Sequence, residues 1–326
     1  MASAERDRSL DLLSGIFVTY MIYTHICETA NLTDTWHYVT LNSFLYFFMP
    51  WFFFKSGMFH RYRTDYGLSL TKLRKRLVIP LLVFSIAAIP MFSIYYVLDY
   101  GGPYWMNFLY SFFYSLIEKS APFGNYPLWY LLALIFIKLI LMVIRSNKLI
   151  LIIAIIGVLS SFLLWYYNIS FIFIVTEVFL GMFFYATGYF LKNIQYKKYV
   201  LPISFLLFIS LAVFYPVHIS VRSNDVYGGG YFVGIISSLL GIISFNCISK
   251  SIMAFNLISK SKVVSFVLLL GEDSMYYYVI HWIYLISLKI VLIFFHMDLT
   301  LLFALLPLTL LVSKKFHILD KYTKAL

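Results

Sequence analysis

Apolar residues run through this chain in long blocks, and short polar segments separate the blocks. Each block is close to the roughly 20 residues that one helix needs to cross a bilayer. No internal repeat and no dividing linker interrupts the pattern, so residues 1–326 are predicted to form a single membrane domain. The predicted membrane helices cover residues 10–30, 43–59, 77–98, 127–144, 149–166, 171–191, 199–217, 230–249, 274–295 and 299–313.

Two connecting segments and the C-terminus complete the predicted arrangement. Residues 99–126 and 218–231 are aromatic loops expected on the outer face, because Trp and Tyr prefer the lipid–water boundary. Residues 251–273 are expected to lie at the cytoplasmic interface or to re-enter the membrane. An eleventh span there would put the C-terminal lysines outside. A short basic tail, about 314–326, is expected in the cytoplasm.

Composition assigns the chain to the membrane proteins. It is 62% hydrophobic and 12% charged, whereas a soluble domain carries about 25% charged residues. With a cytoplasmic N-terminus, most of the 25 Lys and Arg residues fall in alternate loops on the cytoplasmic side, as the positive-inside rule requires. The sequence therefore predicts an all-α polytopic protein of about 10 transmembrane helices with both termini cytoplasmic. The net charge of +11 reflects this topology and not a nucleic-acid-binding face.

The first predicted helix contains an imidazole and an acid. Glu28 follows His25 by three residues, so both side chains share one face and the carboxylate can orient the ring. Ser14 lies eleven residues before His25 on the same face, about 16 Å away along the axis. Ionisable groups in hydrocarbon are rare without a partner or a task. We expect a functional pair, with a histidine satisfied by a neighbouring carbonyl as the alternative.

Basic residues in and beside the next two predicted membrane helices indicate a site for an anionic ligand. Arg74 and Arg76 precede an apolar run, and guanidinium groups bind phosphate oxygens with two hydrogen bonds. Lys55 lies deep in the aromatic stretch "MPWFFFKSGMF", where it either extends to the interface or meets an anion. Ser56 with the following glycine permits close helix packing.

The stretch "GEDSMYYYVIHWIYL" at 271–285 is a predicted helix start with a second membrane histidine. Gly271 and the acidic pair are expected to begin the helix, with Asp273 or Ser274 as its N-cap. His281 follows among tyrosines that can satisfy it by hydrogen bonding. We therefore predict a supporting role for His281 and a chemical role for the first-helix histidine.

These pieces, in this order, resemble the membrane acyltransferase-3 family, whose members acylate hydroxyl groups of glycans, lipids and other acceptors. The resemblance lies in "LDLLSG" with the later His25, in "FFFKSG", in "RKR" followed by "IP", in "PLWYL" at 127–131 and in the final "GEDSMYYYVIH". It implies a catalytic role for His25 and a role at the acyl-donor site for Arg74 and Arg76. Ser14 departs from the pattern, since the family usually places Arg or Lys there. Either Lys55 or another cation replaces it, or the chain belongs to a branch with a different donor or acceptor.

The resemblance implies transfer of an acyl group, acetyl by default, from cytoplasmic acyl-coenzyme A to a hydroxyl group of a cell-surface glycan or lipid-linked sugar. His25 would act as general base, oriented by Glu28, and Arg74, Arg76 and Lys55 would hold the donor. The developing oxyanion needs a hydrogen-bond donor, and Lys55, Ser56 and Trp129 are the candidates. Direct transfer is favoured over an acyl-enzyme, since no nucleophile lies beside a base.

The alternative function is a transporter or flippase for a glycan or its lipid-linked precursor, because membrane histidines and acids also form proton relays. Transporters often consist of two related halves with interrupted helices, and the sequence shows no such halves. We expect the multi-pass protein in the cell (inner or plasma) membrane, with acyl-coenzyme A as a co-substrate, no tightly bound cofactor, no metal and no nucleic acid. The identity of the acceptor and the oligomeric state stay open.

Overall fold

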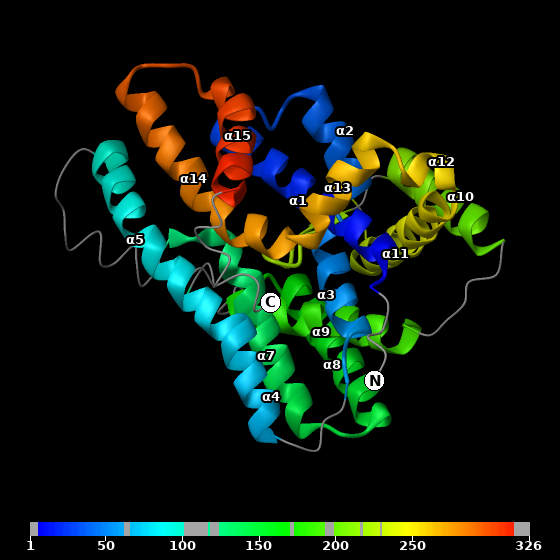
Figure 1. Cartoon of the computed structure of the whole chain (residues 1–326). Helices are drawn as coiled ribbons and strands as arrows, with labels where there is room; N and C mark the ends of the chain where they lie inside the picture. Colours follow the sequence, from blue (N-terminus) through cyan, green and yellow to red (C-terminus); the bar gives the residue numbers. More distant parts are fainter. Residues whose placement is uncertain are drawn as a thin grey trace.

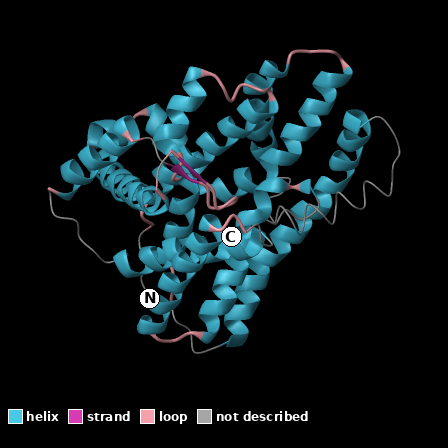
Figure 2. Ribbon diagram, turned by 180° about the vertical axis from the view of Figure 1, so that it is seen from behind, coloured by secondary structure: helices cyan, strands magenta, loops and turns pink. Residues whose placement is uncertain are grey.

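The computed structural model is a bundle of helices (Figure 1). The structure describes residues 6–61, 66–100, 117, 124–169, 173–192, 199–215, 218–228 and 230–315. Within these ranges the strands are β1 (His218–Ile219) and β2 (Val226–Tyr227), which form one small antiparallel hairpin (Figure 2). The predicted all-helical class is confirmed.

Seven helices of the described part are long and apolar enough to cross a membrane. They coincide with seven of the predicted spans, so the chain is a multi-pass membrane protein. The helices are α1 (Arg8–Thr29), α4 (Tyr66–Leu73) continued by the π-helical turn η1 (Arg74–Val78) and α5 (Ile79–Tyr100), η3 (Tyr126–Leu128) with α7 (Trp129–Val143), α8 (Asn147–Tyr166), α9 (Phe173–Leu191), α11 (Tyr231–Ala254) and α14 (Ser274–Phe294).

The other three predicted spans correspond to shorter helices. The apolar helix α10 (Val200–Phe214) has 15 residues, about 22 Å at 1.5 Å per residue, whereas the hydrocarbon core measures about 30 Å. α15 (Leu302–Lys315), which follows the 3₁₀ turn η4 (Leu299–Leu301), has 14 residues. These helices do not by themselves decide the predicted number of ten spans.

The predicted span 43–59 is divided into α2 (Trp36–Leu45) and α3 (Phe48–Met58). Pro50 explains the break. Its ring would clash with the carbonyl group of Tyr46, four residues earlier, if one helix continued through this point. In the first turn of α3 the same proline is tolerated, because the N–H groups there lack helical partners. Prediction from hydropathy alone missed this proline and was wrong to expect one continuous helix.

The segment 251–273 contains the end of α11 followed by α12 (Asn256–Ser259) and α13 (Lys262–Glu272). With 11 residues, α13 is about 16 Å long and cannot cross a bilayer alone. It packs along the first half of α1. A Cβ atom on Gly271 would overlap the Asp11 carbonyl oxygen, and one on Gly15 would overlap that of Val267.

The start of α14 differs from the sequence prediction. Gly271 lies in the last turn of α13 and not at the beginning of α14. Asp273 occupies the N-cap position, but its side chain makes no capping hydrogen bond there. Its carboxylate instead forms an ion pair of 3.0 Å with Lys314 at the end of α15. This ion pair connects the start of α14 to α15.

The helices α3 and α9 touch backbone to backbone. A Cβ atom on Gly57 would overlap the carbonyl oxygen of Tyr185, and one on Gly188 would overlap that of Phe54. Such contacts let membrane helices approach closely. Lys55 and Ser56 lie between these two contacts and are therefore held in place by the backbone of α3.

Two predicted segments fall largely outside the described residues. The aromatic loop at 99–126 is described only at its ends and at residue 117, and the basic tail is described only for residues 314 and 315. The loop at 218–231 is described except for residue 229, and it contains the β-hairpin.

Candidate active site

A cavity of about 830 Å³ lies where the beginnings of α1 and α14 meet the ends of α3 and α13, the stretch from α4 to η1 and one side of α7. Positive charge dominates its wall. Seven lysines and arginines line it against three carboxylates, so an anionic ligand is favoured. The basic residues are Arg6, Lys55, Arg61, Lys72, Arg76, Lys138 and Arg145, and the acids are Asp11, Glu272 and Asp273.

Arg74 and Arg76 do not reach the cavity together. Arg76 lines it, whereas Arg74 does not and is exposed. Both belong to the π-helical turn η1, and helical residues two apart point in different directions. The predicted two-arginine clamp therefore reduces to Arg76 in this structure.

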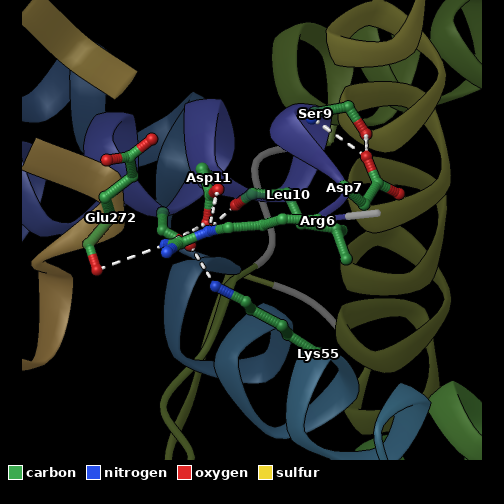
Figure 3. A network of polar contacts seen from close by, with 8 residues as sticks. Arg6, Asp7, Ser9, Leu10, Asp11, Lys55 and Glu272 are labelled. Atoms are coloured by element: carbon green, nitrogen blue, oxygen red, sulfur yellow. Dashed lines mark hydrogen bonds and ion pairs between the residues drawn. The ribbon is translucent and has the colours of Figure 1, made fainter. Parts of the chain in front are cut away.

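A polar network joins the cavity wall to α1 (Figure 3). Lys55 donates a hydrogen bond to the hydroxyl oxygen of Ser14, and Ser14 in turn donates to the Leu10 carbonyl oxygen at 2.7 Å. Lys55 is thus the cation beside position 14. Its ammonium also lies 5.5 Å from the centre of the Trp51 ring.

Asp11 forms the acidic part of this network (Figure 3). Asp11 is 5% exposed, and its carboxylate accepts two hydrogen bonds from Arg6, of 2.6 and 3.0 Å. Arg6 also donates to the backbone carbonyl of Glu272 at 3.3 Å. This bidentate pair connects the beginning of α1 to the end of α13 at the cavity wall.

Two tyrosines line the inner part of the cavity. The hydroxyl groups of Ser56 and Tyr130 are 2.8 Å apart, and Tyr130 donates to the Phe52 carbonyl at 3.1 Å. Ser56 therefore serves as the donor to the tyrosine. Tyr278, which also lines the cavity, donates to the carbonyl oxygen of Pro127.

Trp129 takes a different position from Ser56. Its ring is buried and packs on Phe53, with ring centres 6.1 Å apart. It is not among the residues that line the cavity. The structure therefore does not bring Trp129 together with Lys55 and Ser56.

The two membrane histidines lie against each other. The rings of His25 on α1 and His281 on α14 stack with centres 5.3 Å apart and planes at 19°. Trp282 meets the His25 ring edge-on, also with centres 5.3 Å apart. The Nδ1 atom of His25 is 3.0 Å from a carboxylate oxygen of Glu28, so the predicted pair is present.

The hydrogen-bond partners of His281 fix its tautomer. Its Nδ1 atom lies 3.0 and 2.9 Å from the carbonyl oxygens of Tyr277 and Tyr278. Carbonyl oxygens only accept hydrogen bonds, so Nδ1 carries the proton. The partners are thus backbone groups and not the predicted phenol groups. The Nε2 atom is buried without a hydrogen-bond partner in the described part of the chain.

The cavity and the histidines are separate parts of one arrangement. Neither His25 nor His281 lines the cavity. Tyr278 does, and it precedes His281 by three residues on α14, which is about one helical turn. The arrangement thus joins a basic cavity to a paired imidazole site.

The acyltransferase 3 family model, described as an acyltransferase domain, matches residues 7–313. The match covers almost the whole chain. This chain belongs to the acyltransferase 3 family. It is therefore an acyltransferase, with an acyl donor and an acceptor as its substrates. No curated protein and no solved structure matches the chain.

In this acyltransferase, residues that the sequence analysis did not select also line the cavity. Asp11, Tyr130 and Lys138 are examples. Asp11 falls three residues before Ser14, one helical turn away, and this spacing was the signal available in the sequence. Lys138 lies in a predicted span without any neighbouring acid, and only the fold places it at the cavity.

His60 is a further titratable group that lines the cavity of the acyltransferase. Its Nδ1 atom is 3.0 Å from the Tyr185 hydroxyl oxygen, and its ring packs edge-on against Tyr189. Burial, together with the charges of Lys138 and Lys192, lowers the pKa of His60 to about 4. At neutral pH the ring is therefore uncharged.

The described part of the acyltransferase contains no group of residues that could ligate a metal ion. No three His, Cys, Asp or Glu side chains gather there at a spacing that would hold a metal ion.

Proposed function

We propose that this acyltransferase moves a short acyl group, acetyl in the first instance, from cytoplasmic acyl-coenzyme A to a hydroxyl group of a cell-surface glycan or lipid-linked sugar. The observation that carries the proposal is the His25–Glu28 pair within the bundle. The pair stacks on His281, which lies one helical turn after Tyr278 in the wall of a cavity rich in positive charge. A general base and an anion-binding cavity are the two parts that transfer from a phosphorylated thioester requires.

The cavity supports binding of the nucleotide end of coenzyme A. Arg76 and Lys138 come from different helices and line the same cavity, so they can contact separate phosphate oxygens. Most of the basic lining residues come from segments predicted to be cytoplasmic, and acyl-coenzyme A is a cytoplasmic metabolite. Lys55 holds the donor near the inner end of this cavity.

The thioester then reaches the histidines along the start of α14. Lys55 bonds to Ser14, which lies eleven residues before His25, a distance of about 16 Å along α1. Lys55 therefore contacts the donor far from the reacting carbonyl, and the extended pantetheine arm spans the interval past Tyr278. The position of Lys55 favours donor binding over its alternative role as the oxyanion donor.

The reaction is proposed as a direct transfer. The acceptor oxygen attacks the thioester carbonyl carbon while its proton passes to Nε2 of His25, whose Nδ1–H is oriented by the Glu28 carboxylate. The C–S bond then breaks, the ester forms, and the coenzyme A thiolate leaves and takes up a proton. In this proposal the acceptor arrives from outside, the termini are cytoplasmic and the protein lies in the cell membrane.

The direct experiment uses purified protein in detergent or nanodiscs with radiolabelled acetyl-coenzyme A. The acceptors are glycan and lipid fractions from cells that lack the gene. Label should enter one fraction as a base-labile ester, and mass spectrometry should place one acyl group on a hydroxyl. Absence of transfer to every fraction, from a folded protein that binds coenzyme A, would reject acetyl transfer to these acceptors.

A further inference from the structure

His281 is buried, yet it does not form part of the cavity wall. Its side chain is 0% exposed, and its ring has a single orientation because Nδ1–H is shared between two carbonyl groups of its own helix. The opposite nitrogen, Nε2, has no partner among the described groups. Leaving a buried polar atom unpaired costs stability, so a residue used only to fill space would be better as an apolar one.

The immobile ring of His281 covers one face of the His25 imidazole. Trp282 restrains the same imidazole from another direction, and the Trp282 ring is itself held by a hydrogen bond of 2.9 Å to the Gly124 carbonyl. Glu28 anchors Nδ1 of His25. Three contacts from two helices therefore restrain the His25 ring and leave its Nε2 atom for proton transfer.

The charge on the two rings is also constrained. Nδ1 of His25 faces the Glu28 carboxylate, whereas Nδ1 of His281 faces only neutral carbonyl groups. A flat uncharged ring stabilises a cation lying over its face, and two positive rings in contact would repel each other. The arrangement therefore suits a single positive charge on the stacked pair, the one that a general base gains with the proton during the reaction.

We propose that His281 is a positioning residue for His25: its fixed, uncharged face orients the His25 ring and stabilises the charge that His25 gains with the proton. This inference rests on the proposed function, because it assigns His25 the role of base. His281 itself touches neither the donor nor the acceptor in this mechanism.

Two substitutions distinguish the effect of the flat aromatic face of His281 from the effect of the volume that its side chain fills. His281→Phe keeps an aromatic face against His25, whereas His281→Leu fills the space with an aliphatic side chain and loses the face. We expect His281→Leu to lower kcat by about tenfold to a hundredfold, the range for a misplaced catalytic group, with the KM for acetyl-coenzyme A within about twofold of wild type. His281→Phe should restore most of that loss. Thermal unfolding in detergent reports whether each variant is folded.

Three kinetic outcomes would overturn the proposal. They are a folded Leu variant with wild-type kcat, equal losses of kcat in the Leu and Phe variants, and a loss that appears only in the KM for the donor. If neither variant folds, nitrogen-15 spectra of histidine-labelled wild-type protein decide, with His25→Gln used for assignment. A neutral His281 protonated on Nδ1 is expected, and protonation on Nε2 alone or a charged ring at neutral pH overturns the proposal.

The failure of this inference can be told apart from the failure of the proposed function. A wild-type protein that transfers acetyl groups, and loses transfer in His25→Gln, establishes the base independently of His281. If that holds while His281→Leu retains wild-type kcat, only the positioning role is rejected. If wild-type protein transfers nothing, or His25→Gln stays active, the proposed function itself fails.

Discussion

Lys55 on α3 donates a hydrogen bond to Ser14 on α1, so a positive charge lies beside the first helix although residue 14 itself is neutral. The charge thus reaches this position from a neighbouring helix. Asp11, one turn before Ser14, lines the same cavity. From this contact we propose that Lys55 supplies the cation that residue 14 lacks in this chain.

Lys55→Met should reduce transfer activity by about tenfold or more, since Lys55 is the cation at the inner end of the proposed donor cavity. The exchange Ser14→Lys with Lys55→Ser should recover part of the loss, because it returns one cation to the same place. Ser14→Arg alone should not raise activity, since two cations would then compete for one site. Lys75→Met, an exposed lysine outside the cavity lining, is the matched control. Full activity in Lys55→Met would remove Lys55 from the donor site.

Arg76→Ala should weaken coenzyme A binding more than Arg74→Ala does, because only Arg76 lines the cavity. Arg76→Lys should restore binding partly, since an ammonium group lacks the planar two-donor geometry. Isothermal titration with coenzyme A at two salt concentrations measures both the affinity and its salt dependence. Equal effects of the two alanine substitutions would contradict this assignment.

His25→Gln should lower kcat by about 10²–10⁴-fold, the usual loss when a general base is removed. Affinity for coenzyme A and thermal stability should stay close to wild type, because the base acts in the transition state. Glutamine keeps a polar group at the position but cannot accept the proton at neutral pH. Substantial turnover in a folded His25→Gln protein would leave the mechanism without its base.

Gly271→Ala should destabilise the protein strongly, because the new Cβ atom would overlap the Asp11 carbonyl oxygen and force α13 away from α1. Size-exclusion profiles and unfolding temperatures in detergent provide the measurement. Gly230→Ala is the matched control. Among the described residues, the close neighbour of its Cβ atom would be a Val233 methyl group at 3.7 Å, an ordinary contact. Equal stability of the two variants would show that α1 and α13 can separate without cost.

His60 should make stability depend on pH below neutrality. The folded protein keeps its pKa near 4, while an unfolded histidine titrates near 6.5. Between these values the unfolded state binds the extra proton, so stability falls as the pH drops from about 6.5 towards 4. Unfolding temperatures at pH 7 and pH 5 should differ less in His60→Phe than in wild type. An unchanged difference would assign the acid sensitivity to other groups.

The sequence predicts much of this fold because a bilayer imposes length and hydropathy on each spanning helix. It also predicts the His25–Glu28 pair, since residues three apart on a helix are neighbours. Prediction from the sequence fails where a single residue, or a contact between segments far apart in the chain, determines the structure. Pro50 divides a span that hydropathy joins, and no local pattern shows that His281 stacks on a ring 256 positions earlier in the chain. Which arginine faces the cavity depends on the π-helical turn, which has no distinct signature in the sequence.

The glycine contacts between α3 and α9 bear on how the molecule can move. Alternating access requires helices on either side of a central site to rock past one another. Gly57 and Gly188 hold these two backbones in contact on both sides of Lys55 and Ser56. Rocking of the two helices at this crossing would open voids, because a glycine has no side chain to fill them. These contacts favour a fixed position of Lys55 relative to α9. In the proposed mechanism the two substrates come to this stationary site, each from its own side of the membrane, and only the acyl group crosses between them.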